Sequence, residues 1–422
     1  MAEADPKDMA AAARKYWSAE GYLPGGVIRE VDYSTQSGGL DPMFEGIKIV
    51  DCDTHITESP DLFTSRAPAS MKHKMPVIKR CDDGVDRWFV GDRNFGSVGG
   101  NVIRKDNNKL LGRLSFPTLD EAHPGGWDIP ARLQAMDDMG IYAQICYQNS
   151  GVTQAGSLMT LGDPDLALSI IQIYNDASLD FQEQSGNRIF NMIHLPFWDQ
   201  KEMEKEARRC IDMGLKGFVV PDTPERVGVP SFMHDYWTPF LEMCDATGTS
   251  LNFHINAAID PNTLTWEGFE FEQTLSVVAT MFSIGNAATL GNWMVSGRLD
   301  RHANLKIGLI ESGLGWLTFA IEALEHQFRE MLPGKRDILK KQPWDYFRDH
   351  FMASFWFETI APKYLIEHIG VDNIMFETDF PHPTSLYPGV QEHLVDVFKD
   401  HTPETRKKVL QTNATRFYNL PF

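Results

Sequence analysis

The chain has 422 residues, 42% of them hydrophobic, enough to bury one large core or two of ordinary size. Its formal net charge is −19 and no run of Lys and Arg stands out, which argues against nucleic acid and anionic membranes as partners. The five cysteines are scattered and odd in number, which favours free thiols in a reducing compartment over a disulfide framework.

The N-terminal residues mix acidic and basic side chains and lack the apolar core of a secretion signal. We see no apolar run long enough to span a bilayer, so we expect a cytoplasmic protein with no membrane partner. Residues 1–45 read as an N-terminal extension, with a short helix over Met9 to Ala19 followed by a stretch containing Gly and Ser. Such an arm is expected to pack on a neighbouring subunit or on its own domain, which would occupy residues 46–422.

The segment "GIKIVDCDTHI" predicts a strand buried on both faces, as strands in parallel sheets are. Residues 66–128 that follow are rich in Gly, Asp, Asn and Arg and show little periodicity. We interpret them as an insertion after the first strand, in which "DRWFVGDRNFGSVGGN" could form a small hairpin. Loops of this length are usually functional or mobile.

From residue 128 onward, short apolar runs alternate with amphipathic helical segments. The predicted helices cover residues 128–140, 165–185, 200–213, 233–247, most of 260–301, 313–332, 361–370, 390–399 and 404–410. The predicted strands, after the first, are residues 141–148, 189–196, 215–221, 249–255, 305–312, 351–359 and 373–379. Eight strands, most followed by a helix, predict a (β/α)8 barrel with a parallel sheet.

Carboxylates and imidazoles stand where several of these strands end. Asp53 and His55 follow the first strand, and residues two apart on a strand face the same side. His254 ends the fifth strand and Asp379 ends the eighth. The carboxyl-terminal rim of a (β/α)8 barrel is where such side chains assemble a site. If the four converge, they form a metal site.

Each of these residues has an alternative interpretation when taken alone. The pattern D-x-H is common among surface polar residues, and a lone His254 could be a core histidine. A buried carboxylate such as Asp379 would be costly without a partner, and a metal ion supplies one. Cys52 should alternate with Asp53 along the strand, point away from the site and act as a packed thiol.

Several pieces of the chain resemble the amidohydrolase superfamily, in the branch that includes aminocarboxymuconate semialdehyde decarboxylase and the hydroxybenzoate decarboxylases. They are "IVDCDTHI", "FHIN", "ESGLGWL", "ETDFPHP" and the closing "TNATRFYNL", and they occur in the family's order. The resemblance implies a distorted (β/α)8 barrel that holds one divalent metal ion. It also implies, by position, that Asp53, His55, His254 and Asp379 are the ligands.

The chain departs from the family pattern at two positions. Asp53 stands where the hydrolytic members usually have His, and an acid there resembles the decarboxylases more. Glu311 stands where the sixth strand usually ends in His. We therefore name Glu311, with Asp379 and His254, as candidate catalytic residues. Glu311 could act as a general acid or base, or could orient His254 or His55 as a neighbouring carboxylate.

Two carboxylates and two imidazoles suit Zn²⁺ or Mn²⁺, and the extra carboxylate favours the harder ion. No organic cofactor is expected. Candidate substrate-binding residues are His382, His194 and Trp316, each with a structural alternative: a loop cap, a structural histidine and ordinary packing. Rim aromatics such as Trp316 could wall an apolar pocket.

These features support three hypotheses. The first is a metal-dependent decarboxylase of an aromatic or unsaturated carboxylic acid, a lyase, in which the metal stabilises charge on the substrate oxygen. The second is a metal-dependent hydrolase of an ester, lactone, amide or C–C bond. The third is a barrel that binds a ligand without turnover. The resemblance also suggests a homodimer or a larger homo-oligomer.

Overall fold

The apolar runs of the sequence form one parallel sheet. The structure is a computed structural model that describes residues 28–29, 39–112, 114–255 and 265–422. Within these ranges the sheet has eight strands. They are β2 (Val50–Ile56), β7 (Ala143–Gln148), β8 (Ile189–Asn191), β9 (Gly217–Val219), β10 (Ser250–His254), β11 (Ile307–Ile310), β12 (Phe351–Phe355) and β13 (Ile374–Phe376). These are the eight strands that the sequence predicts.

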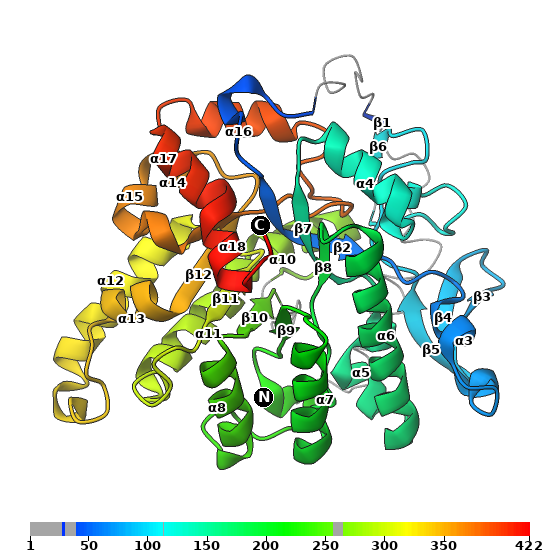
Figure 1. The fold of residues 1–422 in the computed structure, drawn as a ribbon, viewed down its shortest axis with the longest axis horizontal. Coiled ribbons are helices and arrows are strands. Elements are labelled where there is room, and N and C mark those ends of the chain that lie inside the picture. Colours follow the sequence, from blue (N-terminus) through cyan, green and yellow to red (C-terminus); the bar gives the residue numbers. More distant parts are fainter. Residues whose placement is uncertain (1–27, 30–38, 113, 256–264) are drawn as a thin grey trace.

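The strand order is β8-β7-β2-β13-β12-β11-β10-β9, with every neighbouring pair parallel. The two outer strands meet through one parallel bridge between Ile193 and Phe218, where the backbone N–H of Ile193 donates to the carbonyl of Gly217 at 2.8 Å. The sheet curls into a barrel with a weak seam between β8 and β9 (Figure 1). The predicted (β/α)8 class is confirmed, with the distortion at that seam.

Helices surround the sheet (Figure 1). They are α4 (Ile129–Asp138), α5 (Ala155–Met159), α6 (Pro164–Gln184), α7 (Gln200–Asp212), α8 (Thr238–Thr247), α10 (Phe271–Thr280), α11 (Phe282–Val295), α12 (Gly315–Glu330), α13 (Pro343–His350), α14 (Ile360–Tyr364), α15 (Ile366–Ile369), α16 (Val390–Phe398), α17 (Pro403–Lys407) and α18 (Asn413–Tyr418). Capping side chains fix where several of these helices begin. Asp128, Asp163 and Asp199 are N-caps whose side chains accept from backbone N–H groups in the first turn.

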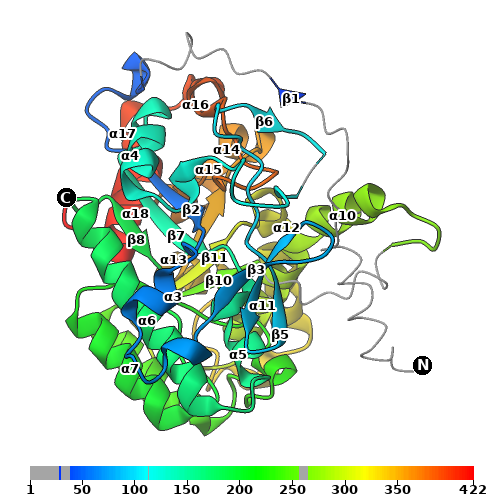
Figure 2. The same ribbon diagram turned by 90° about the vertical axis from the view of Figure 1, so that its right-hand side faces the viewer.

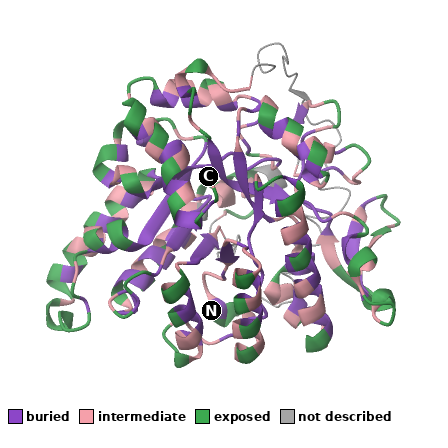
Figure 3. Cartoon of the chain, viewed as in Figure 1, coloured by how far each residue is buried: buried purple, intermediate pink, exposed green. Residues whose placement is uncertain are grey.

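Apolar side chains lie on both faces of the sheet, so its strands are buried while the outer faces of the helices are exposed (Figure 3). One cluster fills the space between sheet and helices, and a second fills the barrel interior with residues such as Val50, Tyr147, Met375 and Tyr418. Burial on both faces explains why the strands read as continuous apolar runs rather than alternating ones.

The segment between β2 and α4 begins with a short helix, α3 (Leu62–Arg66), and builds a small antiparallel sheet beside the barrel (Figure 2). Its strands are β3 (Val77–Arg80), β4 (Asp86–Val90) and β5 (Arg93–Ser97). The predicted hairpin is confirmed as the β4–β5 pair. Trp88 from this sheet belongs to a buried apolar cluster that also contains Tyr174 of α6, which anchors the segment to the barrel. A further antiparallel pair joins β1 (Ile28–Arg29) to β6 (Lys109–Leu110).

Some elements differ from the expectation. The second of the two expected C-terminal helices is longer than predicted, because α17 continues through a π turn, Lys408–Thr412, into α18. The side-chain amide of Asn413 holds α18 by donating to the carbonyls of Val371 and Ile374, a tertiary contact that no local pattern reveals. Helix α13 was also not predicted. The expected helix over Met9 to Ala19 lies outside the described residues, and the domain boundary at residue 45 stays a prediction.

The helical stretch Gln273–Val295 has a mean hydropathy of 1.3 and is long and apolar enough to cross a membrane. The expectation that no run reaches this length was wrong. The stretch contains no charged residue, and its polar residues Ser, Thr, Asn and Gly interrupt the apolar run, which is why the sequence did not reveal it. Length and composition alone are weak grounds for a membrane span, since core helices of soluble proteins pass the same test.

Candidate active site

The ends of β2 and β13 are joined by hydrogen bonds between residues of the site. The backbone N–H of Asp379, just past β13, donates to the carbonyl of Asp53 at 2.9 Å. The backbone N–H of His55 donates in return to the carbonyl of Phe380 at 2.8 Å. These two bonds extend the β2–β13 pairing beyond the formal strands, so residues far apart in sequence are held side by side on the barrel rim.

Successive side chains of β2 do not alternate regularly between the two faces of the sheet. Its pairing with β7 shifts register between Asp51 and Thr54. Cys52 packs in the interior cluster that contains Tyr147, whose ring centroid lies 4.7 Å from that of His254. The expectation that Cys52 points away from the site was wrong, because the register shift puts two successive residues on one side. The prediction of a packed thiol is confirmed, since Cys52 is free and buried.

His254 and Glu311 come from two adjacent strands. His254 pairs with Ile310, so Glu311 lies one residue beyond the end of the β10–β11 ladder. Glu311 has a φ of 56°, in the left-handed region that non-glycine residues rarely adopt. Its backbone N–H is held by the carboxylate of Glu377 and the hydroxyl of Ser354, both at 3.2 Å. Strain of this kind persists where surrounding structure enforces it, typically at functional sites.

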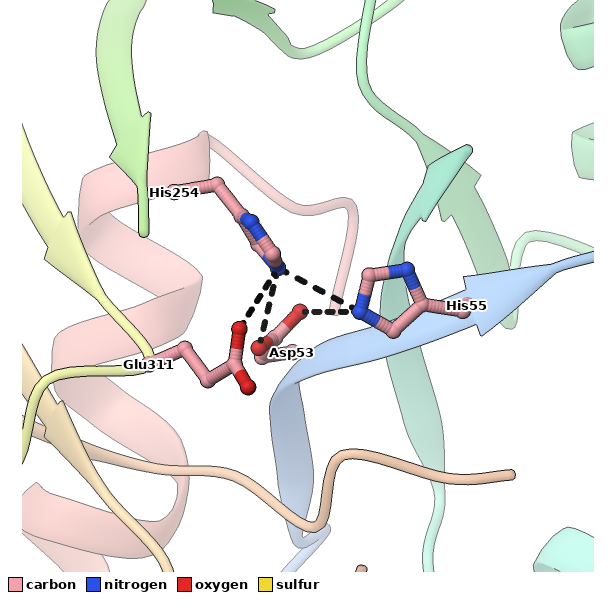
Figure 4. Close-up of side chains that lie close together, drawn as sticks. All are labelled: Asp53, His55, His254 and Glu311. Carbon is pink, nitrogen blue, oxygen red and sulfur yellow. Dashed lines mark hydrogen bonds and ion pairs between the residues drawn. The ribbon is translucent and has the colours of Figure 1, made fainter. Parts of the chain in front are cut away.

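Four side chains converge at the rim (Figure 4). His254 Nε2 lies 3.2 Å from Glu311 Oε2 and 3.4 Å from Asp53 Oδ2. It lies 3.3 Å from His55 Nε2, which in turn is 3.7 Å from Asp53 Oδ1. Ligand atoms about 2.1 Å from one ion at tetrahedral angles lie about 3.4 Å apart, which these separations match.

The donor chemistry also fits a cation. Both carboxylate oxygens of Asp53 are buried without a hydrogen-bond partner. The Nδ1 atom of His55 lies 2.9 Å from the carbonyl of Gln148, and that of His254 lies 3.3 Å from the carbonyl of Ile255. These carbonyls favour protons on Nδ1 and leave the Nε2 lone pairs directed into the cluster. Facing lone pairs and unpaired carboxylate oxygens repel one another unless a cation lies among them.

Asp379 forms an adjoining group that shares His55. Its Oδ1 atom lies 3.4 Å from His55 Nε2 and 2.9 Å from His382 Nδ1, while its Oδ2 accepts from the Thr384 hydroxyl at 2.9 Å. The His382 ring stacks on that of His55, with centroids 3.7 Å apart. Asp379 also has a left-handed backbone, with φ 59°. Asp379 is thus a third carboxylate of the site, beside Asp53 and Glu311.

The side-chain amide of Asn149 fixes the orientation of His382. Its Nδ2 donates to the carbonyl of Gly100 and its Oδ1 accepts from the N–H of Gly100, so the amide cannot be flipped. The same Oδ1 lies 2.9 Å from His382 Nε2, which must therefore be a donor. Because Nδ1 faces the carboxylate of Asp379, each ring nitrogen of His382 has an oxygen atom at 2.9 Å.

Burial shapes the charge states of the cluster. Burial, followed by the charge of His382, lowers the pKa of His55 to about 3. Burial also lowers the pKa of His254 to about 4, so both imidazoles are neutral and able to bind a metal. Burial, together with the charges of Asp379 and Asp53, raises the pKa of Glu311 well above its usual range.

A buried polar chain supports the rim behind the cluster. Asp51 accepts from the N–H and hydroxyl of Thr378, at 2.8 and 2.6 Å, and from the amide of Gln144 at 3.0 Å. Arg132 donates to Gln144 at 2.6 Å and to the carbonyl of His55 at 3.0 Å. These groups fix the backbones that carry His55 and Asp379 without reaching the cavity.

A cavity of about 550 Å³ opens above the cluster. His55, His254, His382 and His194 reach it. Most of its wall follows β7, β8 and β9, and β5 contributes one edge. The other lining residues are Phe95, Gly96, Ser97, Gln148, Asn149, Ser150, Gly151, Gln154, Ala155, Gly156, Ser157, Phe197, Val219, Val220, Pro221, Val227 and Ile255. A cavity of this size accommodates a small organic molecule.

The structure brings together seven of the eight residues singled out from the sequence. Asp53, His55, His254, Glu311, Asp379 and His382 lie in the two groups, and His194 lines the cavity. Trp316 does not line it; its indole donates to the carbonyl of Ser312 and packs against the core. Sequence reasoning missed Asn149, Phe95 and Phe197. The position of Asn149 just past a predicted strand end was the available signal for that residue.

The fold and the cluster define a (β/α)8 barrel with metal-type donors at the carboxyl ends of its strands. A family model described as "Amidohydrolase" matches residues 50–420. The chain therefore belongs to the amidohydrolase family, which confirms the resemblance that the sequence shows.

Known relatives include decarboxylases. Gamma-resorcylate decarboxylase from Polaromonas sp. is 25% identical over 80% of this chain and 98% of its own length. A 2-amino-3-carboxymuconate-6-semialdehyde decarboxylase from Dictyostelium discoideum is 24% identical over 61% of this chain and 68% of its own. The crystal structure of a dihydroxybenzoic acid decarboxylase from Polaromonas sp., with manganese and the inhibitor 2-nitroresorcinol, has a TM-score of 0.58 and 17% identity; the match covers 89% of this chain and 98% of that one. At this identity the structural likeness shows the fold alone.

Proposed function

We propose that this chain is a metal-dependent decarboxylase of an aromatic or unsaturated carboxylic acid that carries an oxygen next to its carboxylate. The observation that supports it most is the cluster of Asp53, His55, His254 and Glu311, whose two imidazoles line the cavity. An acid at the first position of this cluster suits the decarboxylases of the family, and the relatives reported above act as decarboxylases.

The site suits one divalent ion, Mn²⁺ or Zn²⁺, without an organic cofactor. The relative crystallised with manganese favours Mn²⁺. Asp53, His55 and His254 would hold the ion, and Asp379, whose Oδ1 lies 3.4 Å from His55 Nε2, would complete the set and leave Glu311 for proton transfer. When bound, it would supply positive charge that draws in the substrate carboxylate and the adjacent oxygen and stabilises charge developing on that oxygen.

The remaining task is proton transfer. Decarboxylation breaks the bond between a carbon atom and its carboxylate, releases CO2 and leaves an electron pair on that carbon, which must take up one proton. Glu311 is positioned to hold that proton, since Oε2 lies at the cluster, 3.2 Å from His254 Nε2. His382, His194 and Trp316 were the predicted substrate contacts, and cavity lining favours the two histidines.

The test is product analysis on the manganese-loaded chain with a panel of hydroxybenzoic acids. The proposal predicts CO2 release and, in D2O, one deuterium on the carbon that lost the carboxylate. The hydrolase hypothesis, with Asp379 or Glu311 taking a proton from water, predicts addition of water across an ester, lactone, amide or C–C bond instead. Hydrolysis without CO2 release would replace the decarboxylase assignment, and tight binding without either product would favour the binding-protein hypothesis.

A cytoplasmic location and assembly into a homodimer or larger homo-oligomer stay predictions. Light scattering of the full chain and of a variant lacking residues 1–40 tests the assembly. We expect more than one chain per particle, with a smaller particle after the deletion. A monomer in both cases would contradict it.

A further inference from the structure

Three neighbouring helices on one flank of the barrel, α11, α12 and α14, have exposed apolar side chains on or beside them (Figure 1). A Cβ atom added at Gly291 of α11 would lie 3.9 Å from Leu324 Cδ2 of α12. One added at Gly315 of α12 would lie 4.0 Å from Ala361 Cβ of α14, so α12 packs closely against both other helices. The exposed side chains, which we call the apolar band, are Ile284 (47% exposed), Phe319 (79%), Phe357 (59%), Ile360 (68%) and Tyr364 (68%).

The apolar band is large for a surface in contact with water. It holds five of the eleven large hydrophobic side chains that are exposed in the described part of the chain, so these side chains are gathered rather than scattered. Together the five expose apolar surface on the order of 500 Å². A homodimer interface of standard size buries about 800 Å² on each partner, about 65% of it apolar. The band therefore offers the apolar area that one half of a stable dimer interface needs.

The band is poor in charge although the chain as a whole carries −19. The sequence has no charged residue in α11, Phe282–Val295, or in the first two turns of α12, Gly315–Ile321. On α14, the Lys363 amine lies 2.6 Å from a carboxylate oxygen of Asp396. Just before α14, the Glu358 carboxylate accepts from two backbone N–H groups at the start of α12. Two such acidic chains repel each other, so a face without unpaired charge is where they can meet at least cost.

We propose that two copies of this chain associate through the apolar band, face to face about a two-fold axis, so that the band of each copy covers the band of the other. The proposal rests on the self-association predicted above and assigns the surface at which it occurs. It does not depend on the reaction that the site performs. Aromatic side chains dominate the energetics of such contacts, so Phe319 and Tyr364 are its expected anchors.

The geometry disfavours a membrane as the occupant of this face. The apolar stretch Gln273–Val295 runs through α10 and α11, but its second half is fixed to the barrel. The amide of Asn286 donates to the carbonyls of Phe253 and Ile310, at 3.2 and 3.1 Å, at the ends of β10 and β11. The part of the stretch before Asn286 is shorter than the about 20 residues that a membrane-spanning helix needs. The same bonds place the start of α11 at the rim where α12 also begins, which brings Ile284 level with the rest of the band.

The test is sedimentation velocity of the full chain and of single variants over a concentration series, which gives the dissociation constant of the two-copy particle. We expect Phe319→Glu and Ile360→Glu each to weaken association at least about 100-fold, because each would bury an unpaired carboxylate at the contact. Phe319→Leu keeps an apolar side chain at the same place. We expect it to weaken association far less than Phe319→Glu does.

The chain offers a matched control on the same helix pair. Met331 follows the last turn of α12, is 71% exposed and lies outside the band. Met331→Glu adds the same charge at an equally exposed position, so we expect association to change by less than about 2-fold. The far-UV spectrum and the metal content of every variant should match those of the unmodified chain, because the substituted side chains are mostly exposed and contact none of the metal-type donors.

Association that persists undiminished in both glutamate variants would overturn the band as the contact and leave self-association standing. A monomeric unmodified chain would overturn both. If that monomer bound phosphatidylcholine vesicles and Phe319→Glu did not, the band would belong to a membrane surface. If the band of that monomer became accessible to hydrogen exchange only after residues 1–40 were removed, it would belong to the chain's own N-terminal segment. Absence of CO2 release from every acid tested would remove the proposed reaction without touching the interface.

Discussion

Asp53 and Asp379 are neighbours because the backbone N–H of Asp379 donates to the carbonyl of Asp53, yet their carboxylates have opposite surroundings. Burial, with the charge of Asp379, raises the pKa of Asp53 well above its usual range. Burial also acts to raise the pKa of Asp379. The charges and hydrogen bonds of His382 and His55 outweigh burial there, and they hold the pKa of Asp379 below its usual range. The site therefore pairs a compensated carboxylate with one that lacks a partner.

Removing the unpaired carboxylate should abolish metal binding. We expect Asp53→Asn to reduce the manganese content from about one ion per chain to almost none. The metal-free variant should unfold at a temperature no lower than that of the metal-free parent, since neither oxygen of Asp53 accepts a hydrogen bond. Elemental analysis and calorimetry check both points, with the exposed Asp82→Asn as control. Full metal content in Asp53→Asn would contradict the site.

Substitutions of Glu311 and Asp379 should have different effects, because we assign proton transfer to Glu311 and metal binding to Asp379. We expect Glu311→Gln to keep its metal and lose about 10²- to 10⁴-fold in turnover, because the amide cannot deliver the proton. Asp379→Asn should lose the metal itself. Metal analysis and CO2 release, measured on the same samples, distinguish the two. If Glu311→Gln lost the metal while Asp379→Asn kept it, the two residues would exchange roles.

Gly100 lets the segment between β2 and α4 touch the site. A Cβ atom added there would meet His382 Cδ2 at 2.8 Å and Nε2 at 3.1 Å. We expect Gly100→Ala to displace His382 from Asn149 and lower turnover at least about 10-fold, as small misplacements at active sites do. Gly334→Ala is the control, because nothing lies within 4 Å of its added Cβ. Equal kcat for both variants would show that His382 tolerates the shift.

Arg132 should contribute to the stability of the fold because it is buried and makes several hydrogen bonds. It is buried and donates to the carbonyls of His55 and Gly125 and to the amide of Gln144. Arg132→Met leaves those acceptors unsatisfied, so we expect the free energy of unfolding to fall by about 3–5 kcal/mol. Denaturant unfolding checks this against the exposed Arg329→Met, which should change it by less than about 0.5 kcal/mol.

Glu58 predicts a pH dependence of stability. Burial raises its pKa from 4.5 to about 7, so the folded chain binds this proton more tightly than the unfolded chain. The stabilisation is complete below pH 4.5 and is lost as pH rises to about 7, amounting to about 3 kcal/mol. The amide of Glu58→Gln does not ionise. The stability difference between variant and parent should therefore grow in the variant's favour between pH 4.5 and 7 and then level off. A difference independent of pH, in unfolding of the metal-free chains, would contradict this assignment.

The sequence alone determined the strands and what stands at their ends. Apolar runs of four to eight residues bounded by turns report burial on both faces, which parallel strands require. Because the carboxyl ends of such strands share one rim, Asp53, His55, His254 and Asp379 could be expected to meet before any coordinate was known. These inferences need only local patterns and one general rule of barrels.

Tertiary structure decided how those residues meet. A register shift in β2 placed Cys52 on the site's side of the strand, and a left-handed backbone turned Glu311 toward His254. Phe95 reached the cavity only through the path of a long inserted segment, and Asn149 met His382 only through Gly100. Register shifts and inserted segments depend on packing between residues distant in the chain, for which local periodicity carries no signal.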